Sequence, residues 1–197
     1  LSWYTAHFSA ARPEQICGDI TPFYLFHPDV PDRIKARLPD VKLIVLLRDP
    51  VERALSQVFH AQRKGFEPLD LVDALTAEPE RLASGDAFSF QKHSYLSRSR
   101  YLEQLDRYEQ LFPPEQLCVL KSEDLFEASP HIWPTLIKFL KLPTAEAPTQ
   151  IPKANAGMDE ARKVEPRITN KLRELLLPTA QGVRERYGFG WTWDGST

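Results

Sequence analysis

The sequence predicts a single α/β domain, residues 1–197, in which helices flank a mostly parallel central sheet. Two observations carry this prediction. Stretches expected to form strands, at residues 15–20, 41–47 and 116–120, alternate with segments of helical periodicity, and such alternation is typical of parallel sheets with helical connections. The chain has 197 residues, of which 42% are hydrophobic, and this is enough to bury one sizeable core.

The elements before residue 41 are assigned from apolar spacing and from the Pro and Gly residues that end them. They are a helix at 2–9, a short strand at 15–20, an irregular Pro-containing stretch to residue 29 and a helix at 30–37.

Residues 41–47 form an aliphatic run that only Lys42 interrupts. Its length and flanking residues fit a strand buried on both faces of a parallel sheet. Arg48 follows directly. Because ligands of open α/β sheets bind beyond the carboxyl ends of the strands, Arg48 stands where such folds hold their ligands.

A helix is expected to begin at once, over residues 50–64. Asp49 is a good N-cap, Pro50 takes the first helical position, and Glu52 completes the spacing of a capping box. The apolar side chains of this helix recur at helical spacing and form one stripe. They are Val51, Ala54, Leu55, Val58 and Phe59.

A different face of the same helix carries Arg53, Ser56 and His60. A strand that ends in an arginine, followed by a capped helix with polar side chains, is a suitable arrangement for holding an anion. The sequence therefore indicates an anion site at this strand–helix junction.

The later elements are assigned in the same way. They are a helix at 68–77, a surface excursion at 78–92, a long helix at 93–111, a strand at 116–120, and helices at 130–141 and 166–187. Pro178 is expected to break or kink the last helix. No internal boundary divides the domain.

The junction resembles the 3′-phosphate-binding motif of the sulfotransferases that use 3′-phosphoadenosine 5′-phosphosulfate (PAPS). In that family a strand ends in Arg-Asp/Asn-Pro, and a helical Ser follows the Arg by eight residues. Arg48 and Ser56 match both positions, and Arg53 matches a second arginine that is common there. The resemblance implies that these side chains hold the 3′-phosphate, and a forked guanidinium and a hydroxyl suit phosphate oxygens. The alternative is that Arg48 only pairs with a neighbouring carboxylate.

Further segments resemble heparan-type and related bacterial members of the same family. Cys17–Phe26 resembles the family's Glu-Lys-Thr-Pro-x-Tyr segment, and Phe189–Trp191 resembles its closing Phe-Gly-Trp. Ser99–Tyr108 and Gln116–Leu125 resemble its long helix and the strand that follows. Asp19 replaces the usual Glu, and Ile20 replaces the Lys of the animal enzymes. The resemblance implies a P-loop-NTPase-like sulfotransferase fold and transfer of a sulfuryl group from PAPS to a hydroxyl or amine. The acceptor would be a small molecule or a glycan, the product adenosine 3′,5′-bisphosphate, and no metal would be needed.

A loop near residue 155 resembles the family's C-terminal loop over the adenosine and the 3′-phosphate. Lys153, Asn155 and Gly157 could serve there, since a glycine lets the backbone approach a ligand closely. An ordinary surface loop is the alternative.

Two parts of the family pattern are not seen. The 5′-phosphosulfate loop, typically Lys-x-Gly-Thr-x-x-Leu on the first strand, has no counterpart near Leu1, and no catalytic base is identified. Both are expected before residue 1, which makes the chain either a truncated piece or a domain that has lost its catalytic half. A catalytically inactive bisphosphate-binding or scaffold module therefore stays open. A P-loop nucleotide kinase is the other alternative, but it would need a Walker Gly-x-x-x-x-Gly-Lys-Ser/Thr sequence.

Composition limits the remaining possibilities. The 25 basic and 27 acidic residues give a net charge of −2, which argues against a general nucleic-acid-binding surface. No apolar run approaches the length of a membrane span, and a cytoplasmic location is favoured, although a preceding targeting segment would change this. Cys17 and Cys118 fit neither a disulfide scaffold nor a metal site.

Two further groups of residues stand out. His93, Tyr95, Arg98 and Arg100 head the expected long helix, where they could face an acceptor cleft or form a solvated helix face. The C-terminal aromatic residues are expected to pack in the core. They are Tyr187, Phe189, Trp191 and Trp193.

Overall fold

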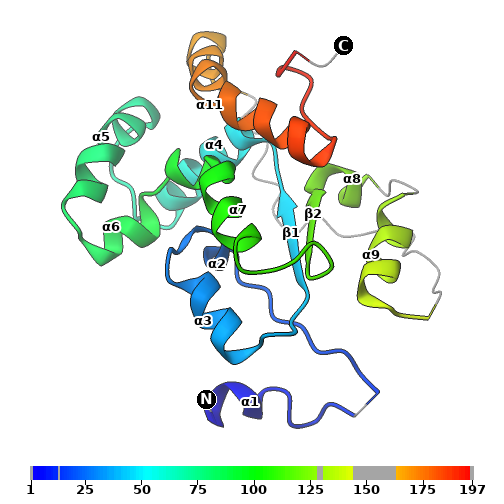
Figure 1. Cartoon of the computed structure of the whole chain (residues 1–197). Helices are drawn as coiled ribbons and strands as arrows, with labels where there is room; N and C mark the ends of the chain where they lie inside the picture. Colours follow the sequence, from blue (N-terminus) through cyan, green and yellow to red (C-terminus); the bar gives the residue numbers. More distant parts are fainter. Residues whose placement is uncertain (1, 13, 128–130, 144–162, 196–197) are drawn as a thin grey trace.

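The computed structural model describes residues 2–12, 14–127, 131–143 and 163–195 (Figure 1). Its elements, in chain order, are α1 (Ser2–Ala6), α2 (Phe23–Phe26), α3 (Val30–Arg37), β1 (Leu43–Leu47), α4 (Pro50–Arg63), α5 (Leu71–Ala83), α6 (Ala87–Lys92), the 3₁₀ helix η1 (Ser97–Ser99), α7 (Tyr101–Glu109), β2 (Leu117–Lys121), α8 (Ser122–Phe126), α9 (Ile132–Leu140) and α11 (Pro166–Tyr187).

The two strands β1 and β2 lie side by side and run parallel, with Leu43 opposite Leu117 and Leu47 opposite Lys121. The chain between them forms the helices α4 to α7. Because the strands run parallel, their carboxyl ends meet at one edge of the sheet. This confirms the predicted α/β class with parallel pairing. Within the described residues the sheet consists of these two strands.

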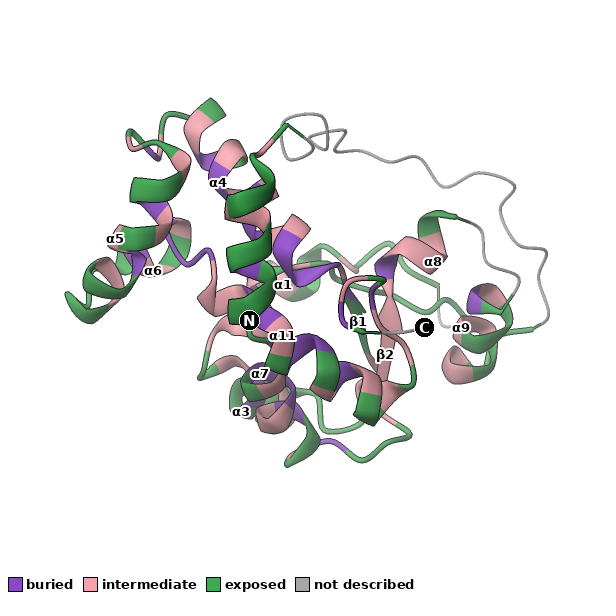
Figure 2. Ribbon diagram, turned by 90° about the horizontal axis from the view of Figure 1, so that it is seen from above, coloured by how far each residue is buried: buried purple, intermediate pink, exposed green. Residues whose placement is uncertain are grey.

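The two faces of the sheet are covered differently. On one face, Val45 and Val119 pack against side chains of α7 and α11. Leu47 belongs to the same core cluster. Figure 2 shows buried residues gathered where α4, α7 and α11 come together. The opposite face lies toward α9, where Ile44 lines an apolar cavity of about 400 Å³. Ile44 and Leu46 remain 40% and 43% exposed on that face.

The strand expected at residues 15–20 is not formed. These residues are exposed and outside any ladder, and Ile20 is 92% exposed. An extended segment gains no ladder hydrogen bonds without a neighbouring strand, and Gly18 and Asp19 belong to the residue types with weak strand preference. The expectation was therefore wrong.

The region after α4 is more helical than expected. The helix expected at residues 68–77 is α5, which starts after its N-cap Asp70 and continues through Pro79. The expected surface excursion contains α6, whose N-cap Asp86 accepts a hydrogen bond from Ser89 N at 2.7 Å. Both aspartate caps are local signals that the polar composition of this stretch concealed.

The long helix expected at residues 93–111 begins only at Tyr101, with α7. The preceding residues enter the core instead of forming a solvated helix, because Ser94, Tyr95 and Ser99 are all 0% exposed. Burial of this segment overrides its helical pattern.

The break or kink expected at Pro178 is not a break, because α11 continues through this residue. Leu172, Leu176, Ala180 and Val183 are buried at helical spacing on both sides of the proline. The packing of this apolar stripe holds the two halves in one helix, and it outweighs the hydrogen bond that a proline removes.

The segment after α11 folds back tightly. Gly188 ends the helix at a φ of 74°, in the left-handed region that glycine adopts without strain. At Gly190 a Cβ atom would lie only 2.2 Å from Asp194 Oδ2. The same carboxylate accepts a hydrogen bond from Trp191 N at 2.9 Å and pairs with Arg184 at 2.8 Å, so it is not free to move aside.

We therefore expect Gly190→Ala to destabilise the fold by about 1–3 kcal/mol, the usual cost of forcing an extra methyl group into a packed site. Urea unfolding followed by circular dichroism measures the change. Gly18→Ala is the matched control, because nothing lies within 4 Å of a Cβ atom there. Equal stability of the two variants would contradict this account of the C-terminal turn.

Candidate functional site

The turn between β1 and α4 carries the predicted anion site. Leu47 ends the strand with only 1% exposure, and Arg48 follows it. Asp49 is the N-cap of α4, as predicted: its Oδ1 accepts hydrogen bonds from Val51 N at 2.8 Å and Glu52 N at 3.1 Å. The start of α4 is thereby fixed relative to the end of the strand.

The carbonyl groups of this turn are bonded from two elements. The Tyr101 hydroxyl of α7 donates to the Arg48 carbonyl at 2.8 Å. The Ser99 hydroxyl of η1 donates to the Pro50 carbonyl at 2.6 Å. The main chain on both sides of Asp49 is therefore held by side chains about fifty residues away in sequence.

Asp49 itself is bonded by two further elements. Its N–H donates to Glu123 Oε1 of α8 at 2.7 Å, in place of the Glu52 carboxylate that the capping-box spacing suggested. Trp193 Nε1 donates to Asp49 Oδ2 at 2.5 Å, and Trp191 Nε1 donates to Glu123 Oε1 at 3.3 Å. Burial raises the pKa of Asp49, and the hydrogen bond from Trp193 opposes that rise.

The Arg48 side chain lies over one face of α4. Its Nη2 is 3.1 Å from Glu52 Oε2, and the two side chains are 28% and 46% exposed. Ser56 lies one helical turn beyond Glu52, on the same face, and is half-buried. An exposed ion pair at this spacing contributes little, so a phosphate group could replace Glu52 as the partner of Arg48.

Arg53 points elsewhere. Its Nε donates to Ser99 Oγ at 2.7 Å, its Nη1 to Gln57 Oε1 at 2.6 Å, and its Nη2 to the Tyr95 carbonyl. Burial lowers the pKa of Arg53. Arg48 thus pairs with Glu52, on the face of α4 that also carries Ser56, whereas the Arg53 guanidinium is bonded to Ser99, Tyr95 and Gln57.

The remaining predicted cofactor residues, Lys153, Asn155 and Gly157, lie outside the described residues. Across the described ranges, no three His, Cys, Asp or Glu side chains are grouped as metal ligands would be. Of the helices that the structure describes, none has both the length and the apolar character of a membrane span.

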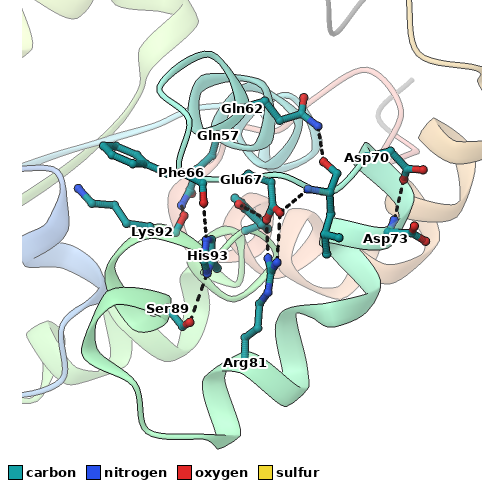
Figure 3. A network of polar contacts seen from close by, with 12 residues as sticks. Gln57, Gln62, Phe66, Glu67, Asp70, Asp73, Arg81, Ser89, Lys92 and His93 are labelled. Carbon is teal, nitrogen blue, oxygen red and sulfur yellow. Dashed lines mark hydrogen bonds and ion pairs between the residues drawn. The ribbon is translucent and has the colours of Figure 1, made fainter.

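The polar group at residues 93–100 does not form a single surface. The His93 ring lies between Phe66 and Ser89 (Figure 3). Its Nε2 is 3.0 Å from the Phe66 carbonyl oxygen, and its Nδ1 is 3.3 Å from Ser89 Oγ. Arg98 lies over the Phe23 ring at 4.6 Å, and Arg100 is exposed. The alternative of a solvated helix face is wrong for the buried His93.

Sequence reasoning missed most of the residues that hold the turn. Trp193 was expected to pack in the core, and Glu123, Ser99 and Tyr101 had no assigned role. One signal was present: Glu123 is the second residue after the end of β2, as Asp49 is the second residue after the end of β1. Since parallel strands bring their carboxyl ends to one edge, these two positions had to be neighbours.

Comparisons with known proteins show the family and the fold of the chain. The family model described as "Sulfotransferase domain" matches residues 26–181. The crystal structure of a sulfotransferase from Alicyclobacillus acidocaldarius superposes with a TM-score of 0.79 and 26% sequence identity, over 98% of this chain and 73% of that one.

Two relatives match by sequence. Human heparan sulfate glucosamine 3-O-sulfotransferase 5 is 27% identical over 147 residues, which are 73% of this chain and 41% of that protein. Membrane-associated sulfotransferase kil1 of Dictyostelium discoideum is 43% identical over 60 residues, 29% of this chain and 13% of that protein. The chain thus spans less than half the length of either relative.

The Trp193–Asp49 hydrogen bond makes stability depend on pH. We expect Trp193→Phe to cost about 1.5–3 kcal/mol at pH 7, the usual loss when a charged group loses a hydrogen bond, because the buried carboxylate of Asp49 keeps its charge. The loss of this bond also raises the pKa of Asp49 further. A carboxyl with a raised pKa binds its proton more tightly in the folded state, so stability rises as the pH falls toward the ordinary value of about 4.

The free energy of unfolding of Trp193→Phe should therefore come closer to the wild-type value as the pH falls from 7 to 5. Urea unfolding at both pH values measures this difference. Trp3→Phe, at a side chain that is 74% exposed, is the control and should have no effect at either pH. A deficit that stays constant with pH would mean that Trp193 stabilises the fold by packing alone.

Proposed function

Since this chain belongs to the sulfotransferase domain family, with a match over residues 26–181, we propose that it binds PAPS through its 3′-phosphate and serves sulfuryl transfer. The family generally uses PAPS as its sulfate donor and acts on small-molecule or glycan acceptors. For the protein that contains this chain, the proposed reaction is transfer of a sulfuryl group to a hydroxyl or amine. Adenosine 3′,5′-bisphosphate is the other product.

The position of Arg48 is the observation that carries this proposal. Arg48 stands at the carboxyl end of a parallel strand, where open α/β folds bind ligands. Among the described residues its guanidinium pairs with Glu52, whose side chain is 46% exposed. A phosphate dianion offers the same guanidinium a bidentate partner, with stronger charge-assisted hydrogen bonds.

Ser56 completes the proposed phosphate contact from the next turns of α4. A hydroxyl on the face that Arg48 covers can donate one more short hydrogen bond to a phosphate oxygen. Lys153, Asn155 and Gly157 are proposed to approach the nucleotide from the C-terminal loop. Arg53 is proposed to support the site by bonding η1 rather than by touching the phosphate, because its three nitrogen atoms already donate to protein groups.

Arg48 and Ser56 act on affinity and orientation in this proposal. Sulfuryl transfer needs the acceptor oxygen or nitrogen in line with the bond that breaks between sulfur and the phosphate oxygen. A nucleotide fixed at its 3′-phosphate cannot slide along that line, and such positioning is a major source of rate enhancement. No side chain of the described chain is assigned as the base that deprotonates the acceptor.

We expect the protein to bind adenosine 3′,5′-bisphosphate far more tightly than AMP, because only the bisphosphate reaches Arg48 and Ser56. Arg48→Ala should weaken bisphosphate binding by roughly 10–150-fold, equivalent to about 1.5–3 kcal/mol for a charge-assisted contact. AMP binding should stay unchanged. Isothermal titration calorimetry with both nucleotides measures these affinities.

The control is Arg33→Ala, which removes a 70% exposed arginine that pairs only with Asp29 on α3. It should leave both affinities unchanged. Equal affinity of the wild-type protein for the two nucleotides would refute the assignment of this turn to the 3′-phosphate.

A further inference from the structure

We propose that Glu78, a buried carboxylate of α5, is a positioning residue for Arg48 and acts through η1. The proposal rests on the proposed function, because the property that Glu78 would set is affinity for the 3′-phosphate. Nothing in the sequence pattern of α5 marks this residue: it lies in a helix, thirty residues from Arg48, and is followed by Pro79.

Glu78 holds the beginning of η1. Its side chain is almost fully removed from water, with the residue 2% exposed. Oε2 accepts a hydrogen bond from Leu96 N at 2.7 Å, and Oε1 accepts one from Ser97 N at 2.8 Å and another from the Ser97 hydroxyl. A carboxylate with both oxygens committed to backbone N–H groups fixes the path of the chain entering this turn.

Gln104 of α7 holds the other side of η1. It is 3% exposed, and its Nε2 lies 3.1 Å from the Ser97 carbonyl and 3.0 Å from the carbonyls of Arg98 and Arg100. Glu78 of α5 therefore binds N–H groups at the start of η1, and Gln104 of α7 binds carbonyl groups along η1 and just after it. These contacts hold η1 independently of its contact with α4.

η1 in turn holds the start of α4 through Ser99, which is 0% exposed. The Ser99 hydroxyl donates to the Pro50 carbonyl at 2.6 Å and accepts from Arg53 Nε at 2.7 Å. A shift of Ser99 would move the Pro50–Val51 peptide at the start of α4 and release the Arg53 guanidinium that braces this helix. Either change alters the direction in which Arg48 leaves the strand.

The carboxylate of Glu78 cannot be replaced by an amide without conflict. Each of its oxygens faces a backbone N–H donor. In Glu78→Gln one of these oxygens becomes an NH₂ group, which donates and does not accept. One buried N–H would then lose its partner, and η1 would have to shift to satisfy it.

The sign of the expected effect separates positioning from simple electrostatics. Glu78 lies close enough to Arg53 and Arg98 to raise the pKa of each, against the burial that lowers it. If Glu78 acted only through its charge, its neutralisation would make the region more positive and strengthen the binding of an anion. If Glu78 positions Arg48, neutralisation weakens that binding.

The test compares Glu78→Gln with Glu67→Gln in the same calorimetric titrations. Glu67 is an equally buried carboxylate, but it binds Arg81 at 3.1 Å, Leu69 N at 2.9 Å and the Tyr95 hydroxyl at 2.8 Å (Figure 3). Among the described residues its carboxylate bonds to neither η1 nor α4, and only the backbone N–H of Glu67, which the substitution keeps, reaches Ala61 of α4. Glu67→Gln therefore reports the effect of general destabilisation.

We expect Glu78→Gln to weaken adenosine 3′,5′-bisphosphate binding by about three- to tenfold, the range typical of residues that act on a site through others. AMP binding should be unchanged, and Glu67→Gln should keep wild-type affinity for both nucleotides. Unchanged or tighter bisphosphate binding in Glu78→Gln would overturn the proposal. An equal loss in Glu67→Gln would also overturn it.

Hydrogen–deuterium exchange provides a readout that needs no ligand. The backbone amides of Asp49, Val51 and Glu52 should exchange faster in Glu78→Gln than in the wild type, and at the wild-type rate in Glu67→Gln. If wild-type protein fails to distinguish the two nucleotides, the proposed function fails, and the exchange comparison alone decides whether Glu78 controls the turn. Equal exchange in all three proteins would refute that control.

A second variant covers the case in which Glu78→Gln does not fold. Gln104→Met keeps the length of the side chain but removes the NH₂ group, whose two N–H donors face the carbonyls of Ser97, Arg98 and Arg100. It should change bisphosphate affinity and amide exchange in the same direction as Glu78→Gln. Wild-type behaviour of Gln104→Met on both readouts would show that η1 does not transmit position to Arg48.

Discussion

Every polar backbone group that leaves water must find a partner, and the turn from β1 to α4 is where this chain meets that requirement most densely. The turn is largely removed from solvent, because Asp49 is 8% exposed and Leu47 is 1% exposed. Its carbonyls, its N–H and its carboxylate are therefore bonded to η1, α7, α8 and the segment after α11. The orientation of these elements follows from the need to reach one turn.

The two arginines near this turn differ in what burial does to them. Arg53 is enclosed, and an enclosed guanidinium is tolerated only when its donors are bonded, so it belongs to the scaffold. The side chain of Arg48 stays 28% exposed, and its ion pair with Glu52 is a weak one, so this cation gains most from an incoming anion. The neighbouring β1 strand, buried at its carboxyl end, supplies the rigidity that a surface arginine would otherwise lack.

Local chemistry was predictable from the sequence, and long-range chemistry was not. The N-cap at Asp49, the strand before it and the stripe of α4 all depend on residues within one or two turns, and these three features were confirmed. The expected burial of the strand on both faces was wrong, because Ile44 and Leu46 are 40% and 43% exposed on one face. The contacts of Arg53 and Asp49 depend on partners that lie 46 and 144 residues away in sequence. No periodicity encodes such partners. The same limit explains residues 15–20, whose strand character depended on a neighbouring strand rather than on their own pattern.

The bond between Trp193 and Asp49 also sets an order of events during protein synthesis. The ribosome adds about 5–20 residues per second, so the 144 residues between these two positions take roughly 7–30 s to make. Throughout that interval the strand and helix on either side of Asp49 can form, but its carboxylate stays hydrated and the end of β1 stays open to solvent. The nascent chain therefore passes through a stage in which the end of β1, the more apolar of the two described strands, lacks the contact with Trp193. This stage ends when the Trp193 segment leaves the ribosome.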